Sequence, residues 1–291
     1  MRSGYGTGAP DPERTVASRI LITRPSEALA AMPEGNQFRP DLFKGTAYYY
    51  EHFRPRYPQP LYTHLLERVQ GRKRLLDIAC GTGQIGVPLS DAFGEVVAID
   101  QETEMIEYAR RLHPNITWIA GAAETVQVTG RFDLITIGNA YHRLNRHEVA
   151  RRAVRWLVPD GCFAVLWSNG PWTEGDDWQL DIADRVERWD QRLAEGRVPT
   201  GWRETMQNEP TAEVLEHAGL AYEGTFTFPI TLTWTIDSLI GFIFSSSTLN
   251  RTVLQDHAEQ FEADIRKVGA GPFMQQTTAA YELARLPKER P

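Results

Sequence analysis

The residues from Leu75 to Gly86, LLDIACGTGQIG, place an acid and several glycines directly after a short apolar stretch. The apolar stretch is typical of a buried strand, and the glycines allow a tight turn and close approach of a ligand to the backbone. A helix that follows such a turn offers free N–H groups and the positive end of its dipole. Because residues 81–86 read G-x-G-x-x-G, the spacing alone is compatible with a dinucleotide such as NAD.

Asp77 favours a different cofactor. Its carboxylate ends the predicted strand four positions before Gly81, where it would repel a pyrophosphate and attract a cationic ammonium. A cofactor built from an adenosine, a sulfonium and an amino acid tail carries such an ammonium. The pattern therefore favours S-adenosylmethionine over NAD or NADP, and an NAD(P)-dependent oxidoreductase stays open as the alternative.

Three further segments are predicted to lie at the same edge of the sheet, each at or just after the end of a strand. Asp100 ends the apolar run VVAID, 23 positions after Asp77, and is placed to accept hydrogen bonds from ribose hydroxyls. GAAE, residues 121–124, and NAYHRL, residues 139–144, follow the next two predicted strands. The carboxyl ends of parallel strands form the ligand-binding edge of an open α/β sheet, so these segments are expected around one site.

The elements that would position these residues alternate between strand and helix. Strands are predicted at 75–78, 96–99, 116–119, 134–137 and 163–167, with helices at 102–112 and 147–157, which indicates a parallel sheet covered on both faces. Further on, Trp178 to Leu193 form a helical stripe, and Phe226 to Ile236 alternate as in a strand. Pro229 lacks a ladder donor, which makes that strand an edge strand or two shorter pieces. A last amphipathic helix is predicted at 253–268.

The ordered motifs resemble those of class I S-adenosylmethionine-dependent methyltransferases. They are LLDIACGTGQ, VVAID with Met105 on the next helix, GAAE, FDLITIGNAYHRL and LVPDGCFAVLW. Residues 50–58, YEHFRPRYP, are similar to a Y-x-x-x-R-P-x-Y-P segment in a small-molecule branch related to trans-aconitate methyltransferase. The resemblance covers residues 43–170 and, loosely, the C-terminal third.

The resemblance implies an α/β, Rossmann-like fold with a mostly parallel central sheet, helices on both faces and a helical, aromatic cap. The expected division is an N-terminal arm or lid at 1–42, a core that binds S-adenosylmethionine at 43–170, a cap or substrate-binding insertion at 171–222, and strands and helices completing the core at 223–291.

The expected site residues follow from the resemblance and from the strand ends. Cofactor contacts are expected from Tyr50, Arg54, Asp77, Ala79, Gly81, Gly83, Asp100, Gln101, Met105, Ala123, Glu124 and Asn139. Substrate contacts are expected from Arg56, Tyr57, Tyr141, Trp167 and Trp172. The acid that usually follows Gly121 in this family is Ala122 here, so contact with the adenine amine must come from Glu124 or the backbone, or be absent.

His142 and Glu174 are the candidate bases. An acidic oxygen on the acceptor would need one of them to take its proton, although each also has a purely structural interpretation. An electron-rich carbon would instead need aromatic faces around a developing cation, which the tryptophans between 167 and 202 could supply. In that alternative the acceptor is an alkene such as a phosphate-bearing prenyl compound, and Arg54 and Arg56 suit its phosphate. A non-catalytic module that binds S-adenosylmethionine is a third alternative.

Composition and net charge limit the kinds of partner and ligand that we expect for this chain. The net charge of −7 gives no sign of nucleic acid or membrane binding, no apolar run approaches the length of a membrane helix, and the N-terminus lacks a signal-peptide pattern. With two cysteines, a cytoplasmic location is expected, and a small-molecule substrate with no metal ion is the expected ligand set.

Overall fold

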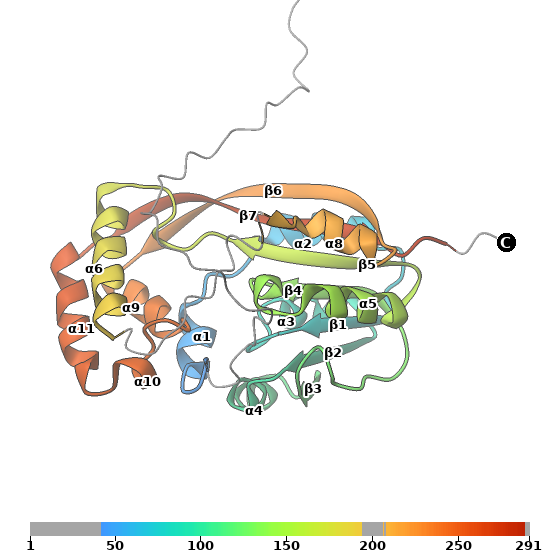
Figure 1. Cartoon of the computed structure of the whole chain (residues 1–291), viewed down its shortest axis with the longest axis horizontal. Coiled ribbons are helices and arrows are strands. Elements are labelled where there is room, and N and C mark those ends of the chain that lie inside the picture. Colours follow the sequence, from blue (N-terminus) through green and yellow to red (C-terminus); the bar gives the residue numbers. More distant parts are fainter. Residues whose placement is uncertain (1–41, 194–205, 207, 289–291) are drawn as a thin grey trace, which may run out of the picture. The chain divides into compact units, whose positions relative to one another are not determined.

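The computed structural model describes residues 42–193, 206 and 208–288. These residues form a seven-stranded sheet in the order β3-β2-β1-β4-β5-β7-β6 (Figure 1). The strands are β1 (Arg74–Ile78), β2 (Glu95–Asp100), β3 (Thr117–Ala120), β4 (Phe132–Gly138), β5 (Leu157–Ser168), β6 (Ala221–Trp234) and β7 (Phe273–Arg285). β1 to β5 are parallel, whereas β7 runs antiparallel between β5 and β6. All five strands predicted between residues 75 and 167 are confirmed.

Helices cover both faces of this sheet because alternate strand residues are apolar on opposite sides. Leu75 packs in one buried cluster with α2 (Gln59–Arg68), α3 (Gly86–Leu89) and α4 (Thr103–Leu112). Leu76 packs in a second cluster with α5 (Arg146–Trp156) and α8 (Thr211–His217). A short 3-10 helix, η1 (Ser90–Ala92), links α3 to β2. The predicted Rossmann-like fold is therefore confirmed.

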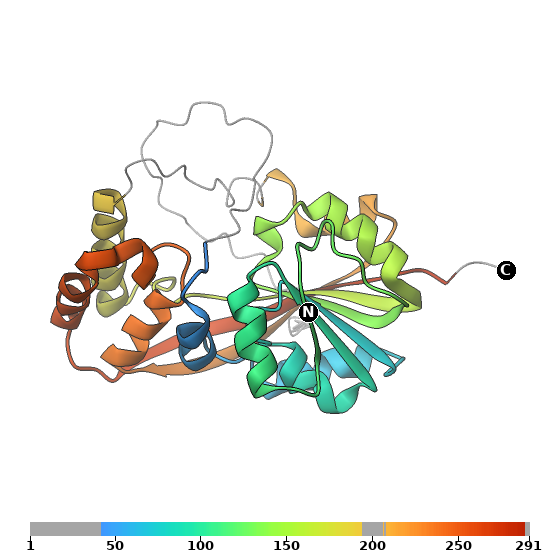
Figure 2. The same ribbon diagram turned by 90° about the horizontal axis from the view of Figure 1, so that it is seen from below.

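A separate helical cluster lies beside the far ends of the long strands β6 and β7. It contains α6 (Asp177–Leu193), α9 (Ile236–Phe244), α10 (Arg251–Leu254) and α11 (Ala258–Ile265), and Figures 1 and 2 show these helices grouped away from the five parallel strands. Trp189, Phe244 and Phe261 are buried at its centre. Helix α1 (Ala47–Phe53) packs against α9. Residues 171–222 thus contribute α6 to this cluster and α8 to the sheet.

Two predictions about the C-terminal third have different outcomes. β6 pairs only with β7, so the strand that contains Pro229 is an edge strand, as expected. The single helix predicted at 253–268 is wrong, because Gln255 has a φ of 47°, outside the helical region. The chain there forms α10, the 3-10 turn η3 (Gln255–His257), α11 and the 3-10 turn η4 (Arg266–Val268). Among the helices of the described ranges, none has the length and apolar character needed to cross a bilayer.

Candidate functional site

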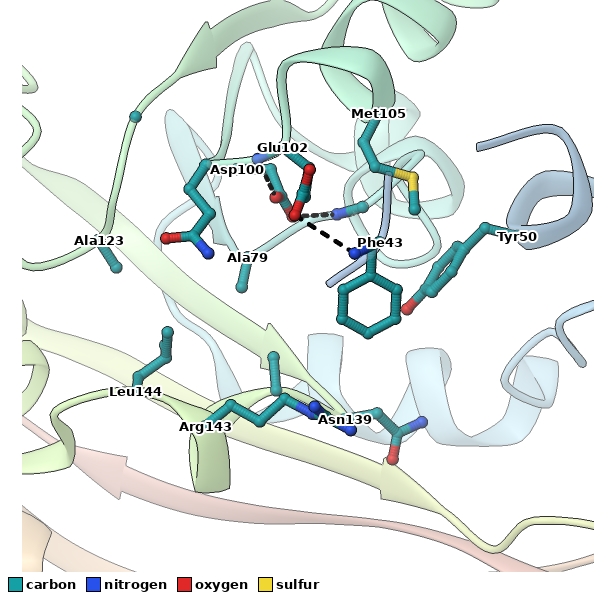
Figure 3. Close-up of a pocket in the computed structure, with 14 residues that line it drawn as sticks. Phe43, Tyr50, Ala79, Asp100, Glu102, Met105, Ala123, Asn139, Arg143 and Leu144 are labelled. Carbon is teal, nitrogen blue, oxygen red and sulfur yellow. Dashed lines mark hydrogen bonds between the residues drawn. The ribbon is translucent and has the colours of Figure 1, made fainter. Parts of the chain in front are cut away.

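A pocket that is partly open to solvent, with about 600 Å³ of empty space when the solvent at its mouth is included, lies at the carboxyl ends of the parallel strands. Its walls come from the loops after β1, β2, β3 and β4, and from α1 and the turn before it (Figure 3). The lining residues are Phe43, Tyr50, Ala79, Gly81, Asp100, Gln101, Glu102, Met105, Gly121, Ala123, Asn139, Ala140, Arg143 and Leu144. This is the edge at which open α/β sheets bind ligands.

The glycine loop after β1 is shaped by a close contact with Tyr50. Gly81 has a φ of 55°, and a Cβ added there would lie 2.9 Å from Cε1 of the Tyr50 ring. The Gly81 N–H donates to Oδ2 of Asp100 at 2.8 Å, which ties the loop to the end of β2. Both the backbone conformation and the close approach of a ring therefore require glycine at this position.

Asp100 and Gln101 present polar groups to the same pocket. Oδ1 of Asp100 accepts a hydrogen bond from the Glu102 N–H at 2.9 Å, and burial raises the pKa of the Asp100 carboxyl despite these N–H donors. A carboxylate has about four acceptor positions and the backbone N–H groups of Gly81, Gln101 and Glu102 act on this one, which leaves capacity for a further donor. The Nε2 atom of Gln101 is buried and has no hydrogen-bond partner within the described part of the chain. Buried amides are normally paired, so this donor fits a polar ligand.

A turn at residues 42–45 closes one side of the pocket. The Phe43 N–H lies 3.4 Å from Oε1 of Glu102, and the Gly45 N–H donates to Oε2 of Glu104 on α4 at 2.5 Å. Asn250 donates to the Leu42 carbonyl at 3.1 Å from the N-terminal end of α10. The Phe43 ring is thereby held at the pocket wall, edge-on to Tyr50, with ring centres 6.2 Å apart. The expected N-terminal arm, apart from residue 42, lies outside the described residues.

Eight of the expected cofactor contacts come together in this pocket: Tyr50, Ala79, Gly81, Asp100, Gln101, Met105, Ala123 and Asn139. The other four expected contacts, Arg54, Asp77, Gly83 and Glu124, do not line the pocket. Glu124 accepts the Asn145 N–H at 2.9 Å, and a Cβ on Gly83 would meet Val87 and Trp118 in the interior.

Asp77 also lies outside the pocket wall. Its side chain is 1% exposed, accepts the Gly86 N–H at 2.8 Å and accepts the Thr136 hydroxyl at 2.8 Å. Burial raises the pKa of this carboxyl to about 7. In the structure, the carboxylate thus joins β1 to the first turn of α3 and to β4, instead of facing the pocket as the sequence argument required.

Arg54 joins α1 to the helical cluster. Its Nε donates to Oγ of Ser245 at 2.8 Å and its Nη2 donates to the Ser245 carbonyl at 3.1 Å. The guanidinium also lies over two rings, 4.9 Å from the centre of Tyr50 and 4.6 Å from the centre of Phe242. Burial lowers its pKa. Arg54 is therefore behind the pocket wall, in contact with Tyr50.

The two candidate bases lie in different surroundings. His142 belongs to the 3-10 turn η2 (Tyr141–Arg143), between pocket residues Ala140 and Arg143 but not among the lining residues. Burial, with the charges of Arg143 and Arg146, lowers the pKa of His142 to about 4.

Glu174 accepts hydrogen bonds from Gln179 and Gln275 at 2.8 Å, and from Asn169 and Thr277. These donors belong to the loop before α6, to α6 itself and to β7. They give the Glu174 carboxylate a clear structural role, because it fastens that loop to the sheet.

The expected substrate contacts do not line this pocket. Tyr141 is buried and donates to the Arg146 carbonyl at 3.0 Å, and Trp172 packs edge-on against Phe242 in the helical cluster. Arg56 pairs with Glu51 and is largely exposed. Tyr57 is 8% exposed, and its hydroxyl has no hydrogen-bond partner among the described residues. Trp167 lies half-buried near the end of β5.

Six lining residues were missing from the expected set: Phe43, Glu102, Gly121, Ala140, Arg143 and Leu144. Most belong to segments already singled out, since Gly121 begins GAAE and three others lie within NAYHRL. Strand-end position could have identified these residues. Phe43 had no such signal, because it precedes every motif and reaches the pocket only through the turn before α1.

Comparison with known proteins agrees with the geometry. Residues 75–161 match the family described as a methyltransferase domain. The matched residues run from β1 into β5 and include the loops after β1 to β4. A protein of Dictyostelium discoideum named as a methyltransferase is 30% identical over 132 residues, which are 45% of this chain and 49% of that protein.

A second relative and one solved structure are also similar to this chain. A Saccharomyces cerevisiae protein named as an S-adenosylmethionine-dependent methyltransferase is 30% identical over 132 residues, 42% of this chain and 45% of that one. The solved structure of a type II methyltransferase from Anaeromyxobacter dehalogenans aligns with a TM-score of 0.56 at 22% identity, covering 81% of this chain and 100% of that chain. This last likeness is one of fold. The chain spans about half the length of the curated relatives it matches.

Proposed function

We propose that this chain binds S-adenosylmethionine and transfers its methyl group to a small-molecule acceptor. The observation that carries the proposal is the convergence of Gly81, Asp100 and Gln101 on one pocket of a methyltransferase domain. The pocket offers a carboxylate that can still accept hydroxyl donors and a buried amide donor without a partner. A nucleoside with ribose hydroxyls and ring nitrogens would satisfy both groups.

In this proposal the residues of the chain bind and orient the reactants. Bound S-adenosylmethionine supplies a methyl group already activated by its sulfonium. Asp100 and Gln101 would hold the nucleoside, while Met105 and Ala123 provide apolar contact at the pocket wall. Asn139 has a φ of 50° at the end of β4, and its side-chain oxygen accepts the Ser168 N–H at 3.1 Å. This bond fixes the end of β4. The acceptor would lie next to this strand end, in line with the methyl group.

Calorimetric titration tests the cofactor. We expect S-adenosylmethionine and S-adenosylhomocysteine to bind and NADH not to bind. Asp100→Ala should weaken binding of the homocysteine form by roughly 1–3 kcal/mol, because ribose hydroxyls lose a buried charged acceptor. Asp91→Ala, which removes an exposed acid outside the pocket, is the matched control. Tighter binding of NADH than of S-adenosylhomocysteine would favour the oxidoreductase alternative and overturn the proposal.

Turnover with a labelled methyl group separates an enzyme from a binding module. Candidate acceptors with acidic hydroxyls, and prenyl compounds that carry phosphate, are incubated with the protein and labelled S-adenosylmethionine. NMR of the product then distinguishes an oxygen-bound methyl from a carbon-bound methyl. Binding of the cofactor without transfer to any acceptor of either class would support the non-catalytic alternative.

A further inference from the structure

Arg143 brings a positive charge to the pocket without an acidic partner in the described part of the chain. Its guanidinium carbon lies 5.5 Å from the centre of the Phe43 ring, and its side chain makes no hydrogen bond or ion pair with the described residues. Burial lowers the pKa of Arg143, and the nearby charge of Arg54 lowers it further. Arginine nevertheless stays charged in proteins, so a partly buried cation faces the pocket uncompensated.

The acids of the pocket do not neutralise this charge. Both oxygens of Asp100 accept backbone N–H groups, from Gly81 and from Glu102. The pKa of Asp100 is raised by burial and lowered by backbone N–H groups, with no guanidinium contributing. Glu102 accepts the Phe43 N–H. Each of these acids thus accepts a backbone N–H, and within the described part of the chain neither pairs with Arg143, so the charge of Arg143 is left for a ligand.

A second unpaired donor lies beside Arg143. The Tyr50 hydroxyl makes no hydrogen bond with the described residues, and the charge of Arg143 acts on its pKa. Figure 3 shows the Arg143 side chain running below the Phe43 ring toward Asn139, with the Tyr50 hydroxyl directed into the same space. A guanidinium and a hydroxyl that converge in this way match the oxygens of a carboxylate or phosphate.

We propose that Arg143 and the Tyr50 hydroxyl form a subsite for an oxyanion at the Asn139 end of the pocket. The oxyanion is either the carboxylate in the amino acid tail of S-adenosylmethionine or an acid group on the methyl acceptor. This inference rests on the proposed function, because both sources assume that the pocket holds that cofactor. The guanidinium donates two hydrogen bonds to the oxyanion, the hydroxyl donates a third, and the buried charge is neutralised.

The experiment compares Arg143→Gln with wild type by calorimetry. The probes are S-adenosylhomocysteine and 5′-methylthioadenosine, which shares the nucleoside and sulfur but lacks the amino acid tail. Malonate and inorganic phosphate are then titrated into protein saturated with S-adenosylhomocysteine. Arg111→Gln is the matched control, since its guanidinium also lies over a ring, 5.6 Å from the centre of Tyr108, but on α4 outside the pocket. Arg143→Lys keeps the charge and should restore part of any loss.

The outcomes distinguish the two sources. If the cofactor supplies the oxyanion, Arg143→Gln weakens binding of S-adenosylhomocysteine about 10- to 100-fold and leaves 5′-methylthioadenosine unchanged. If the acceptor supplies it, both nucleosides bind as before, and only the wild-type complex binds malonate or phosphate. Equal losses for both nucleosides, or binding of all four probes unchanged from wild type, would overturn the inference. Failure of wild type to bind S-adenosylhomocysteine would instead contradict the proposed function.

Discussion

The lowered pKa of His142 predicts how folding stability depends on pH. This effect of burial can be measured independently of any catalytic role of the residue. The unfolded chain takes up a proton at this imidazole near its ordinary pKa of 6.5, whereas the folded chain does so only near 4. Folding stability therefore falls as the pH is lowered from 6.5 to 4, because the unfolded state binds more protons in this range. At about 1.4 kcal/mol per pKa unit, the full effect is about 3 kcal/mol, and partial exposure of the ring reduces it to about 1–3 kcal/mol.

The perturbation is His142→Gln, which removes the titrating group and keeps a polar side chain. Urea unfolding, followed by tryptophan fluorescence at a series of pH values, gives the free energy of unfolding of both proteins. We expect the free energy of unfolding of wild type minus that of the variant to fall by about 1–3 kcal/mol as the pH is lowered from about 7 to about 4. His52→Gln removes an exposed imidazole on α1 and controls for the substitution itself. Parallel pH curves for wild type and His142→Gln would refute the reasoning.

The same low pKa limits His142 as a base. An imidazole that binds a proton only near pH 4 drives proton transfer from a hydroxyl poorly at neutral pH. We therefore expect His142→Gln to lower kcat by less than about tenfold, below the roughly 10²–10⁴-fold typical of a general base. An oxyanion bound at Arg143 would offset one of the charges that lower this pKa. A loss of kcat in the general-base range would show that the bound complex restores the basicity of the ring.

Three further substitutions test contacts around the pocket. Gly81→Ala should lower both the melting temperature and the affinity for S-adenosylhomocysteine, at a cost of about 1–3 kcal/mol, because a Cβ would lie 2.9 Å from the Tyr50 ring; unchanged affinity would contradict this. Gly241→Ala places a Cβ within 2.3 Å of the Phe53 ring and should cost about 1–3 kcal/mol in urea unfolding by separating α1 from α9; wild-type stability would disprove that packing. Tyr57→Phe should raise the free energy of unfolding by about 1 kcal/mol, since the hydroxyl is buried without a partner among the described residues; a loss of stability would reveal a partner.

A substitution at Gly175 serves as a control for Gly81→Ala, which combines backbone strain at a positive φ with a steric contact with the Tyr50 ring. Gly175 has a φ of 101°, and an added Cβ there meets no atom within 4 Å. Gly175→Ala therefore measures the cost of a left-handed backbone alone. Because L-residues tolerate the φ of 55° at Gly81 better than the φ of 101° at Gly175, any excess loss in Gly81→Ala is at least the contribution of the contact with Tyr50.

The parallel strands could be predicted because each one is specified by a short, continuous stretch of sequence. Each strand from β1 to β5 is a short apolar run, and the acid or glycine that follows it ends the strand at the edge where ligands bind. Asp100 and Asn139 were selected by this rule, and both line the pocket. Position along the chain does not determine which way a side chain turns, however. Asp77 satisfies the same rule, yet its carboxylate bonds to Gly86 and Thr136 inside the fold.

The remaining site residues depend on contacts between distant segments. Phe43 enters the pocket through bonds from its turn to Glu102, which immediately precedes α4, and to Glu104 in its first turn, 59 positions along the chain. The helical cluster joins α6 to α9 and α11 across the whole of β6, and no pattern within either segment indicates that pairing. The relation of residues 50–58 to trans-aconitate methyltransferases stays a prediction, because the matched domain begins at residue 75.

The role of Arg54 links the helical cluster to the pocket. Its guanidinium bonds to Ser245 at the end of α9 and lies between the rings of Phe242 and Tyr50. Tyr50 in turn packs against Gly81 in the loop after β1. Because each of these contacts is close and partly buried, α9 cannot shift without moving the Arg54 side chain or breaking its bonds to Ser245. Arg54, which the sequence predicts to contact a ligand, thus holds the aromatic wall of the pocket against the helical cluster in this structure. The proposed oxyanion subsite therefore uses Arg143 instead.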